Sequence, residues 1–188
     1  NSLELSDMIN TDIYSGGCLD LGAGHMNPLK FVQGLGIAAK KNKAQIFEKS
    51  YVEKINYGEK NTHVLSNGFK VICDYLIIAC NGYLGNLDQN ISSRVMPINN
   101  FIITTEVLEK NLIGSFIKNN YAVVDNKFVP NYFRPSPDNR LIFGGGENYT
   151  YRFPKDIKKM VRKKMIKVYP QLDKVRIDFA WGGTLAVT

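Results

Sequence analysis

Tyr132 and Arg134 are the side chains best suited to bind a small ligand. They flank Phe133 in a predicted strand over residues 129–134, and strand residues two positions apart point to the same face. An arginine can hold a carboxylate through two parallel hydrogen bonds, and a tyrosine hydroxyl can donate another. A surface cross-strand pair would show the same spacing, so the pair alone leaves both interpretations open.

The segment Arg140–Gly146 leads from a basic residue through a short apolar strand into three consecutive glycines. Glycine weakens a strand, so this run predicts a sharp turn, a flexible loop, or a backbone held close to a bulky group. Glu147 and Asn148 follow and do not begin a helix, so the run fits neither known type of phosphate-binding glycine loop.

The residues that most often carry catalysis show no productive spacing here. The two histidines and three cysteines form no CxxC pair and no ligand set for zinc. No Ser-His-Asp or Cys-His arrangement follows from the spacing either. We therefore assign no catalytic residue and no metal site, and expect reduced cysteines in a cytoplasmic protein.

Composition limits the remaining classes. The 188 residues are 44% hydrophobic, which suits one large domain or two small ones. No apolar run approaches the ~18 residues that cross a bilayer, and no signal peptide is visible. We expect no membrane partner, and the sequence leaves the oligomeric state open.

The net charge of +7 is concentrated in residues 155–167. There, apolar residues recur at helical spacing between the lysines, with Pro154 in the first turn and Pro170 as a stop. This pattern predicts an amphipathic helix with a solvated basic face. We therefore expect no nucleic-acid partner.

The first half of the chain resembles part of an α/β domain. Asn27-Pro28 predicts the start of a helix that extends to Ala39. Strands are then expected in order, with Asn67-Gly68 as a hairpin turn; they cover 44–49, 51–57, 62–65 and 69–73. The wholly apolar run Tyr75–Cys80 predicts a strand buried on both faces, as in a parallel sheet.

The second half is predicted to be rich in antiparallel strands. Those strands cover 96–106, 121–125, 129–134, 140–143 and 175–181, with a short helix over 112–118. The whole is an α+β (mixed α/β) fold with two parts. Residues 22–90 would form the later part of a Rossmann-like domain, and 1–21 with 91–188 a separate sheet domain.

Six segments occur in the order seen in the D-amino-acid oxidase superfamily, and they resemble most its γ-glutamylputrescine oxidoreductase branch. These segments are 24–29, 79–87, 132–134, 139–146, 169–172 and 177–183.

The resemblance implies an FAD-dependent enzyme of putrescine catabolism or a related route. It would oxidise the C–N bond of a small-molecule amine or amino acid to an imine, with O₂ as the expected acceptor. The sequence does not separate an oxidase from a dehydrogenase. The residues that match the cofactor-binding positions are Val52, Ala79, Cys80, Asn81 and Gly82. The residues that match the substrate-facing positions are Tyr132, Arg134, Phe143, Gly145, Gly146 and Trp181. Superfamily members often carry a basic or imidazole group near 145 and 146, where glycine cannot transfer protons.

The chain also departs from that family. The dinucleotide-binding fingerprint and the C-terminal segment that closes over the flavin are both absent. The chain therefore resembles an internal fragment, which we expect to bind FAD weakly or not at all and to be inactive alone. The alternative is a non-enzymatic binding domain with a degenerate flavoprotein fold.

Overall fold

The computed structural model describes residues 2–150 and 152–188 and divides the chain into two compact units. The sheet unit comprises Asn1–Ala23 and Pro97–Val187. The hairpin unit comprises Gly24–Met96, together with Thr188. Their assignment to a substrate-binding and an FAD-binding domain stays a prediction.

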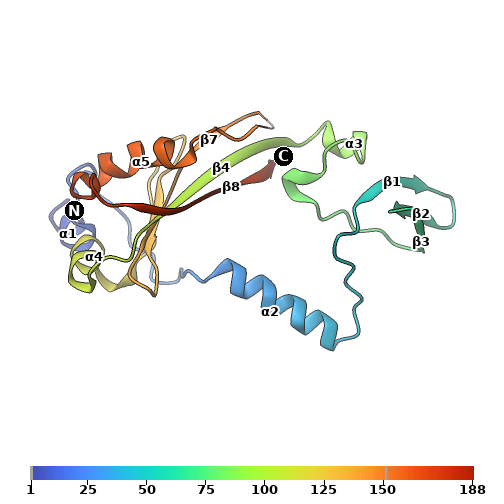
Figure 1. Cartoon of the computed structure of the whole chain (residues 1–188), viewed down its shortest axis with the longest axis horizontal. Coiled ribbons are helices and arrows are strands. Elements are labelled where there is room, and N and C mark those ends of the chain that lie inside the picture. Colours follow the sequence, from blue (N-terminus) through green and yellow to red (C-terminus); the bar gives the residue numbers. More distant parts are fainter. Residues whose placement is uncertain (1, 151) are drawn as a thin grey trace. The chain divides into compact units, whose positions relative to one another are not determined.

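The sheet unit is built on five strands in the order β5-β6-β7-β4-β8 (Figure 1). Strand β6 pairs antiparallel with β5 and with β7, and β7 pairs antiparallel with β4. The strand bounds are β4 Met96–Thr105, β5 Val123–Val124, β6 Tyr132–Pro135, β7 Leu141–Asn148 and β8 Ile177–Val187. The helices of this unit are α1 Ser2–Ile9, α4 Lys110–Phe116 and α5 Ile157–Val168.

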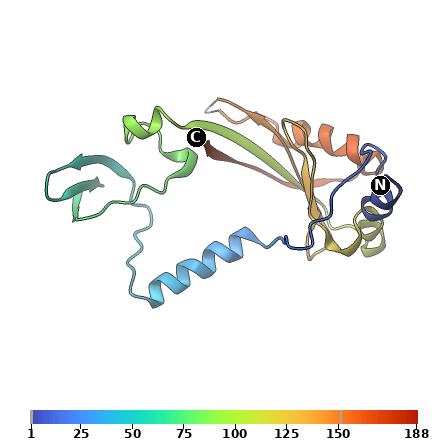
Figure 2. The ribbon, with the colours of Figure 1, turned by 180° about the vertical axis from the view of Figure 1, so that it is seen from behind.

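Helix α5 covers one face of the sheet, as the views from both sides show (Figures 1 and 2). Asp156 caps its start by accepting a hydrogen bond from the backbone N–H of Lys159. Its buried side chains, Val161, Met165 and Val168, lie at helical spacing. Four of its five lysines are exposed, and the fifth, Lys164, is half-buried beside β7. The predicted amphipathic helix is therefore confirmed, whereas the expected absence of a nucleic-acid partner stays a prediction.

The core of the sheet unit lies between the sheet and its helices. Phe133 and Phe143 stack with ring centroids 5.3 Å apart, and Tyr169 meets Phe133 edge-on at 5.6 Å. All three rings are buried. Interdigitated aromatic and aliphatic side chains of this kind give the unit a single well-packed core.

The hairpin unit contains helix α2 Pro28–Lys41, the three-stranded antiparallel sheet β1-β2-β3 and the short helix α3 Gln89–Ser92. Its strands are β1 Val52–Tyr57, β2 Thr62–Ser66 and β3 Phe69–Cys73. The predicted cap is confirmed, since Asn27 accepts a hydrogen bond from the N–H of Lys30. The predicted turn is also confirmed, because Asn67 and Gly68 have φ of 49° and 78°, as a tight hairpin requires.

Two predicted strands of this unit are wrong. Residues 44–49 form no strand, and neither does Tyr75–Cys80, which joins no sheet and leaves Tyr75 92% exposed. A strand needs a neighbour for its N–H and C=O groups, and no described segment pairs with either run. The apolar composition alone therefore does not produce a strand here.

Candidate functional site

Tyr132 and Arg134 share one face of the sheet, opposite the face that α5 covers. Along β6, burial alternates, so Phe133 points into the core and its two neighbours point the other way. Tyr132 lies opposite Gly144, and Arg134 lies opposite Ile142 on β7. The predicted common orientation of the pair is confirmed. We call this surface, made by Asn100, Tyr132, Arg134, Ile142 and Gly144, the ligand face.

The ring of Tyr132 lies directly on the backbone of Gly144. A Cβ atom at residue 144 would be 1.9 Å from Cε2 and 2.1 Å from Cζ of that ring, so only glycine fits. The hydroxyl then donates a hydrogen bond of 2.6 Å to Oδ1 of Asn100 on β4. Burial raises the pKa of Tyr132 to about 12, so the phenol stays protonated near neutral pH.

The next two glycines form a β-bulge rather than the expected loop or turn. Asn100 pairs with Glu147 and Ile102 with Gly144, so two residues of β7 oppose one residue of β4. Gly146 has φ of +90°, a backbone conformation that favours glycine. Strand β7 therefore continues to Asn148 instead of ending at the glycines.

Gly145 and Gly146 face the helix side rather than the ligand face. A Cβ atom on Gly145 would lie 3.2 Å from Cδ of Lys164, and one on Gly146 would lie 3.4 Å from Cε of Met160. One alternative predicted from the sequence is that the backbone of the three glycines lies close to a bulky group. In this structure that group is the ring of Tyr132 for Gly144, and α5 for Gly145 and Gly146. Their predicted substrate contact stays untested.

Phe143 and Trp181 lie in different environments, although both were predicted to face the substrate. The Phe143 ring is fully buried in the core, on the face opposite Tyr132, because strand residues alternate. Trp181 is 44% exposed on β8. A Cβ atom on its neighbour Gly182 would lie 2.7 Å from Cδ1 of the buried Phe101 ring, so Gly182 faces the core and Trp181 points away from it. The side chain of Phe143 is therefore a packing residue in this unit.

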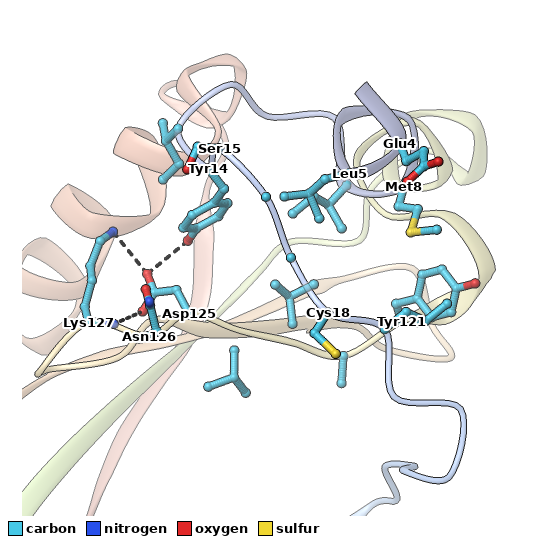
Figure 3. Close-up of a pocket in the computed structure, with 18 residues that line it drawn as sticks. Glu4, Leu5, Met8, Tyr14, Ser15, Cys18, Tyr121, Asp125, Asn126 and Lys127 are labelled. Carbon is cyan, nitrogen blue, oxygen red and sulfur yellow. Dashed lines mark hydrogen bonds and ion pairs between the residues drawn. The ribbon is translucent and has the colours of Figure 1, made fainter. Parts of the chain in front are cut away.

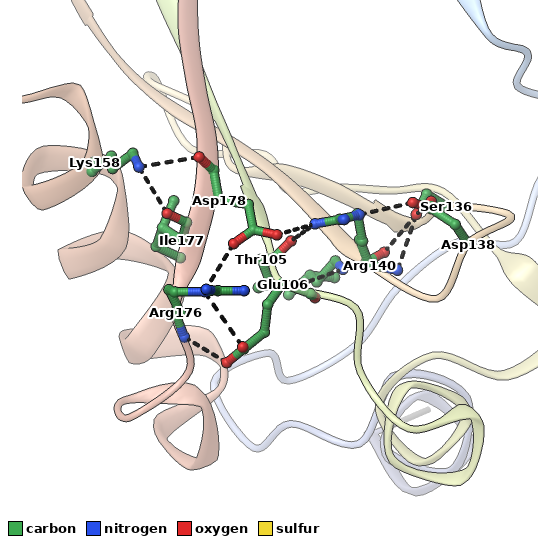
Figure 4. A network of polar contacts seen from close by, with 10 residues as sticks. Thr105, Glu106, Ser136, Asp138, Arg140, Lys158, Arg176, Ile177 and Asp178 are labelled. Carbon is green, nitrogen blue, oxygen red and sulfur yellow. Dashed lines mark hydrogen bonds and ion pairs between the residues drawn. The ribbon is translucent and has the colours of Figure 1, made fainter.

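Arg140, just before β7, links the turn between β6 and β7 to β4 and β8 (Figure 4). Its Nη1 lies 2.6 Å from Oδ2 of Asp178 and 2.8 Å from the carbonyl of Thr105, and its Nε lies 2.7 Å from Asp138. The hydrogen bond from Arg140 holds the pKa of Asp178 below its usual range. Arg176 adds a second cation 3.0 Å from Asp178. The balanced charges indicate a structural role, which the sequence did not predict.

A cavity of about 750 Å³ lies elsewhere in the sheet unit (Figure 3). It is lined by α1, by residues 13–19 and by residues 121–127. At its edge, the carboxylate of Asp125 accepts hydrogen bonds from Tyr14 and Asn131 and contacts Lys127. Burial would raise the pKa of Asp125, but these hydrogen bonds outweigh burial and lower it. No predicted site residue lines this cavity, and no motif in the sequence indicates it.

The predicted cofactor residues all lie in the hairpin unit. Val52 begins β1 beside a bulge in its pairing with β2, and it is half-buried. Ala79 and Cys80 precede a 3-10 turn that begins at Asn81, whose φ is +51°, and Gly82 is buried. Ala79 has a small side chain and Gly82 has none, which suits the close approach of a flat ring system. No phosphate-binding loop accompanies them among the described residues, so they fit part of an FAD site and not a whole one.

Residues 2–150 and 152–188 contain neither a cluster of metal-binding side chains nor a membrane-spanning helix. Over this range no group of three or more His, Cys, Asp or Glu side chains could hold a metal ion. In the same range, no helix is long and apolar enough to cross a membrane.

Comparison with known proteins assigns the chain to a family. The model of the family DAO, described as FAD dependent oxidoreductase, matches residues 2–188. The chain belongs to this family. The predicted resemblance is thereby confirmed, and with it the mixed α/β fold of FAD-dependent oxidoreductases.

Curated relatives in this family match nearly the whole chain. A protein named probable oxidoreductase OrdL from Rhizobium meliloti (strain 1021) is 37% identical over 98% of the chain. The γ-glutamylputrescine oxidoreductase of Escherichia coli (strain K12) is 36% identical over 96% of the chain. The matched regions are 43% and 42% of those relatives, so the chain spans less than half of their length.

Solved structures show the same fold at low sequence identity. An L-proline dehydrogenase from P. horikoshii superposes with a TM-score of 0.68 at 20% identity, over 86% of this chain and 44% of that one. A glycine oxidase from Bacillus cereus ATCC 14579 superposes with a TM-score of 0.65 at 14% identity, over 84% and 42%. At these identities the likeness concerns the fold alone.

Proposed function

We propose that this chain is the substrate-facing part of an FAD-dependent oxidoreductase that oxidises the C–N bond of an amine to an imine. The observation that carries the proposal is the family match over residues 2–188. The ligand face of the sheet supports it, because Tyr132 and Arg134 present a polar and a cationic group side by side. After the oxidation, water hydrolyses the imine product to an aldehyde or a keto acid.

The substrate class that we propose is a γ-glutamylputrescine-like amine or an amino acid. The support is the name of the Escherichia coli relative, which is 36% identical to this chain. Both compounds carry an amine and a carboxylate, and the guanidinium of Arg134 suits a carboxylate.

FAD is the cofactor that the family implies, and O₂ is the acceptor that we propose. When bound, FAD supplies hydride acceptance from the substrate carbon, and its reoxidation by O₂ yields hydrogen peroxide. Val52 and Ala79–Gly82 are the residues of this chain that would contact it. Because these make only part of a site, we expect the chain by itself to bind FAD weakly or not at all.

The test uses the complete gene product that contains this chain. After purification, its visible spectrum is recorded, and γ-glutamylputrescine, putrescine, glycine and L-proline are each added without oxygen. We expect bleaching of a bound flavin by at least one amine and formation of peroxide when air is admitted. N-acetylputrescine keeps the free amine but lacks the glutamyl carboxylate, so it tests whether the enzyme requires that carboxylate.

Two outcomes separate the alternatives. A gene product that binds no flavin and oxidises no amine would overturn the enzyme proposal and favour the non-enzymatic binding domain. Reduction of the flavin without peroxide in air would keep the oxidoreductase and replace O₂ by another acceptor.

A further inference from the structure

We propose that Asn100 and Gly144 fix Tyr132 as a hydrogen-bond acceptor for the substrate's amine, which makes Asn100 a positioning residue. This inference rests on the proposed function and names how the ligand face would recognise the reacting nitrogen. Three strands contribute one residue each: β4 Asn100, β7 Gly144 and β6 Tyr132.

The ring of Tyr132 is held in place by shape. It occupies the volume that any side chain at residue 144 would need, with Cε2, Cζ and Cδ2 all within 2.6 Å of the Cβ position. The ring thus crosses β7 and reaches Asn100 on the strand beyond it. A residue other than glycine at 144 would displace the ring and break the contact with Asn100.

The hydroxyl of Tyr132 has one proton, and it already donates that proton in a hydrogen bond within the protein. A phenol offers one O–H donor and acceptor lone pairs. The donor points to Oδ1 of Asn100 at 2.6 Å, a normal distance for an O–H···O hydrogen bond. Only lone pairs remain for a ligand. The sequence-based expectation that Tyr132 donates to a ligand is therefore replaced by the opposite role.

An acceptor at this point favours an amine over a carboxylate, because an amine brings N–H donors. It also suits the proposed reaction. With FAD held in the complete protein, the carbon next to the nitrogen would lose a hydride to it. The nitrogen lone pair would then form the C=N bond, and the nitrogen would become positively charged. Its N–H is then a stronger donor, so the hydrogen bond to Tyr132 tightens in the transition state.

The test compares substitutions on the three strands in the complete flavoprotein. Tyr132→Phe, Asn100→Ala and Gly144→Ala should each lower kcat/KM for the best substrate by about 3–10-fold, with a fall in kcat. Asn100→Asp should recover most of the loss, because a carboxylate still accepts the phenol proton. The double variant Asn100→Ala/Tyr132→Phe should have a kcat/KM no lower than that of either single variant, because each substitution removes the same hydrogen bond between Asn100 and Tyr132.

Tyr121→Phe is the matched control. It removes a hydroxyl that also hydrogen-bonds an asparagine, Asn119, but away from the ligand face. We expect its kcat/KM within twofold of the wild type.

A second readout does not depend on turnover. In protein labelled with 3-fluorotyrosine, the ¹⁹F resonance missing from Tyr132→Phe identifies this residue. Asn100→Ala and Gly144→Ala should shift that resonance without ligand, and Tyr121→Phe should not. γ-Glutamylputrescine should shift it further in the wild type, whereas N5-butylglutamine, which lacks the terminal amine, should not.

The possible failures are distinct. If the wild type oxidises no amine, the proposed function fails, while the ¹⁹F shifts still test the contact between Asn100 and Tyr132. If the wild type is active but Asn100→Ala or Tyr132→Phe keeps full kcat/KM, the acceptor role is wrong. It is also wrong if N5-butylglutamine shifts the Tyr132 resonance as strongly as γ-glutamylputrescine.

Discussion

The two units of this chain differ in how much of their apolar surface they bury. In the sheet unit, a cluster of fifteen buried hydrophobic residues joins the sheet to its helices. In the hairpin unit, helix α2 has no buried residue, and Phe69 on β3 is 77% exposed. Helices α2 and α5 and the turn at Asn67-Gly68 nevertheless form where local signals predict them. Local signals therefore suffice to shape an element but not to bury it.

The largest expected contrast is in hydrogen exchange. Amides of β4 and β7 should exchange about 10³-fold more slowly than those of α2, because a packed core must open before they reach water. Exchange followed by mass spectrometry measures both units in one experiment. Equal protection of α2 would break the comparison.

Truncating an aromatic side chain should destabilise the sheet unit much more than the hairpin unit. Phe143→Ala should lower the free energy of unfolding of the sheet unit by about 3–5 kcal/mol, since it leaves a cavity beside Phe133. Denaturation monitored by the fluorescence of Trp181, the single tryptophan, reports this unit. Phe69→Ala in the hairpin unit is the matched control and should change the transition by less than about 0.5 kcal/mol. If Phe143→Ala does not fold, Phe143→Leu gives the milder measurement.

A buried hydroxyl tests the polar part of the same core. Tyr169 is fully buried, and its hydroxyl lies 2.7 Å from the carbonyl oxygen of Ile9 and 3.3 Å from that of Phe116. Tyr169→Phe removes this donor and should cost about 1–3 kcal/mol in unfolding experiments. Tyr75→Phe, on a side chain 92% exposed, should have no effect. A neutral Tyr169→Phe would mean that water replaces the donor.

Alkaline pH should destabilise the sheet unit through its tyrosines. Burial raises the pKa of Tyr132 from 10 to about 12 and also raises that of Tyr169. Between these values the unfolded chain loses protons that the folded chain keeps, so stability is full below pH 10 and falls toward pH 12. Tyr132→Phe should flatten this fall by roughly 1 kcal/mol, after allowance for partial exposure. Unfolding curves at pH 8 to 12 would show it.

The smallest effect concerns the hairpin unit, where turn chemistry takes the place of a core. Gly68 has φ of +78°, so Gly68→Ala should cost the β2–β3 hairpin about 1 kcal/mol. Faster amide exchange in β2 and β3, with no change in the Trp181 transition, is the expected result. A shift of that transition would show that the two units unfold together.

The sequence predicted elements well where the signal is local. The cap at Asn27, the turn at Asn67-Gly68 and the basic helix α5 are all formed as predicted. The strand predicted over Tyr75–Cys80 is not formed, because a buried strand needs neighbouring strands and an apolar composition does not provide them. The common face of Tyr132 and Arg134 followed from strand alternation alone, but the partner of Tyr132 did not. Asn100 is 32 residues away from Tyr132 in the sequence. The two side chains meet because β4 and β6 lie on either side of β7 and the Tyr132 ring crosses β7 at Gly144.

The sequence by itself determined the family, helices α2 and α5, the turn at Asn67-Gly68, and the alternation that sets Tyr132 and Arg134 on one face. Only the tertiary structure decided the meaning of the three glycines. Gly144 admits the ring of Tyr132, and the next two form a bulge against α5. A run of glycines indicates that a backbone needs free space or an unusual φ. Which group fills that space depends on the order of the strands in the sheet. That order depends on contacts between segments distant in the chain, which local sequence does not encode.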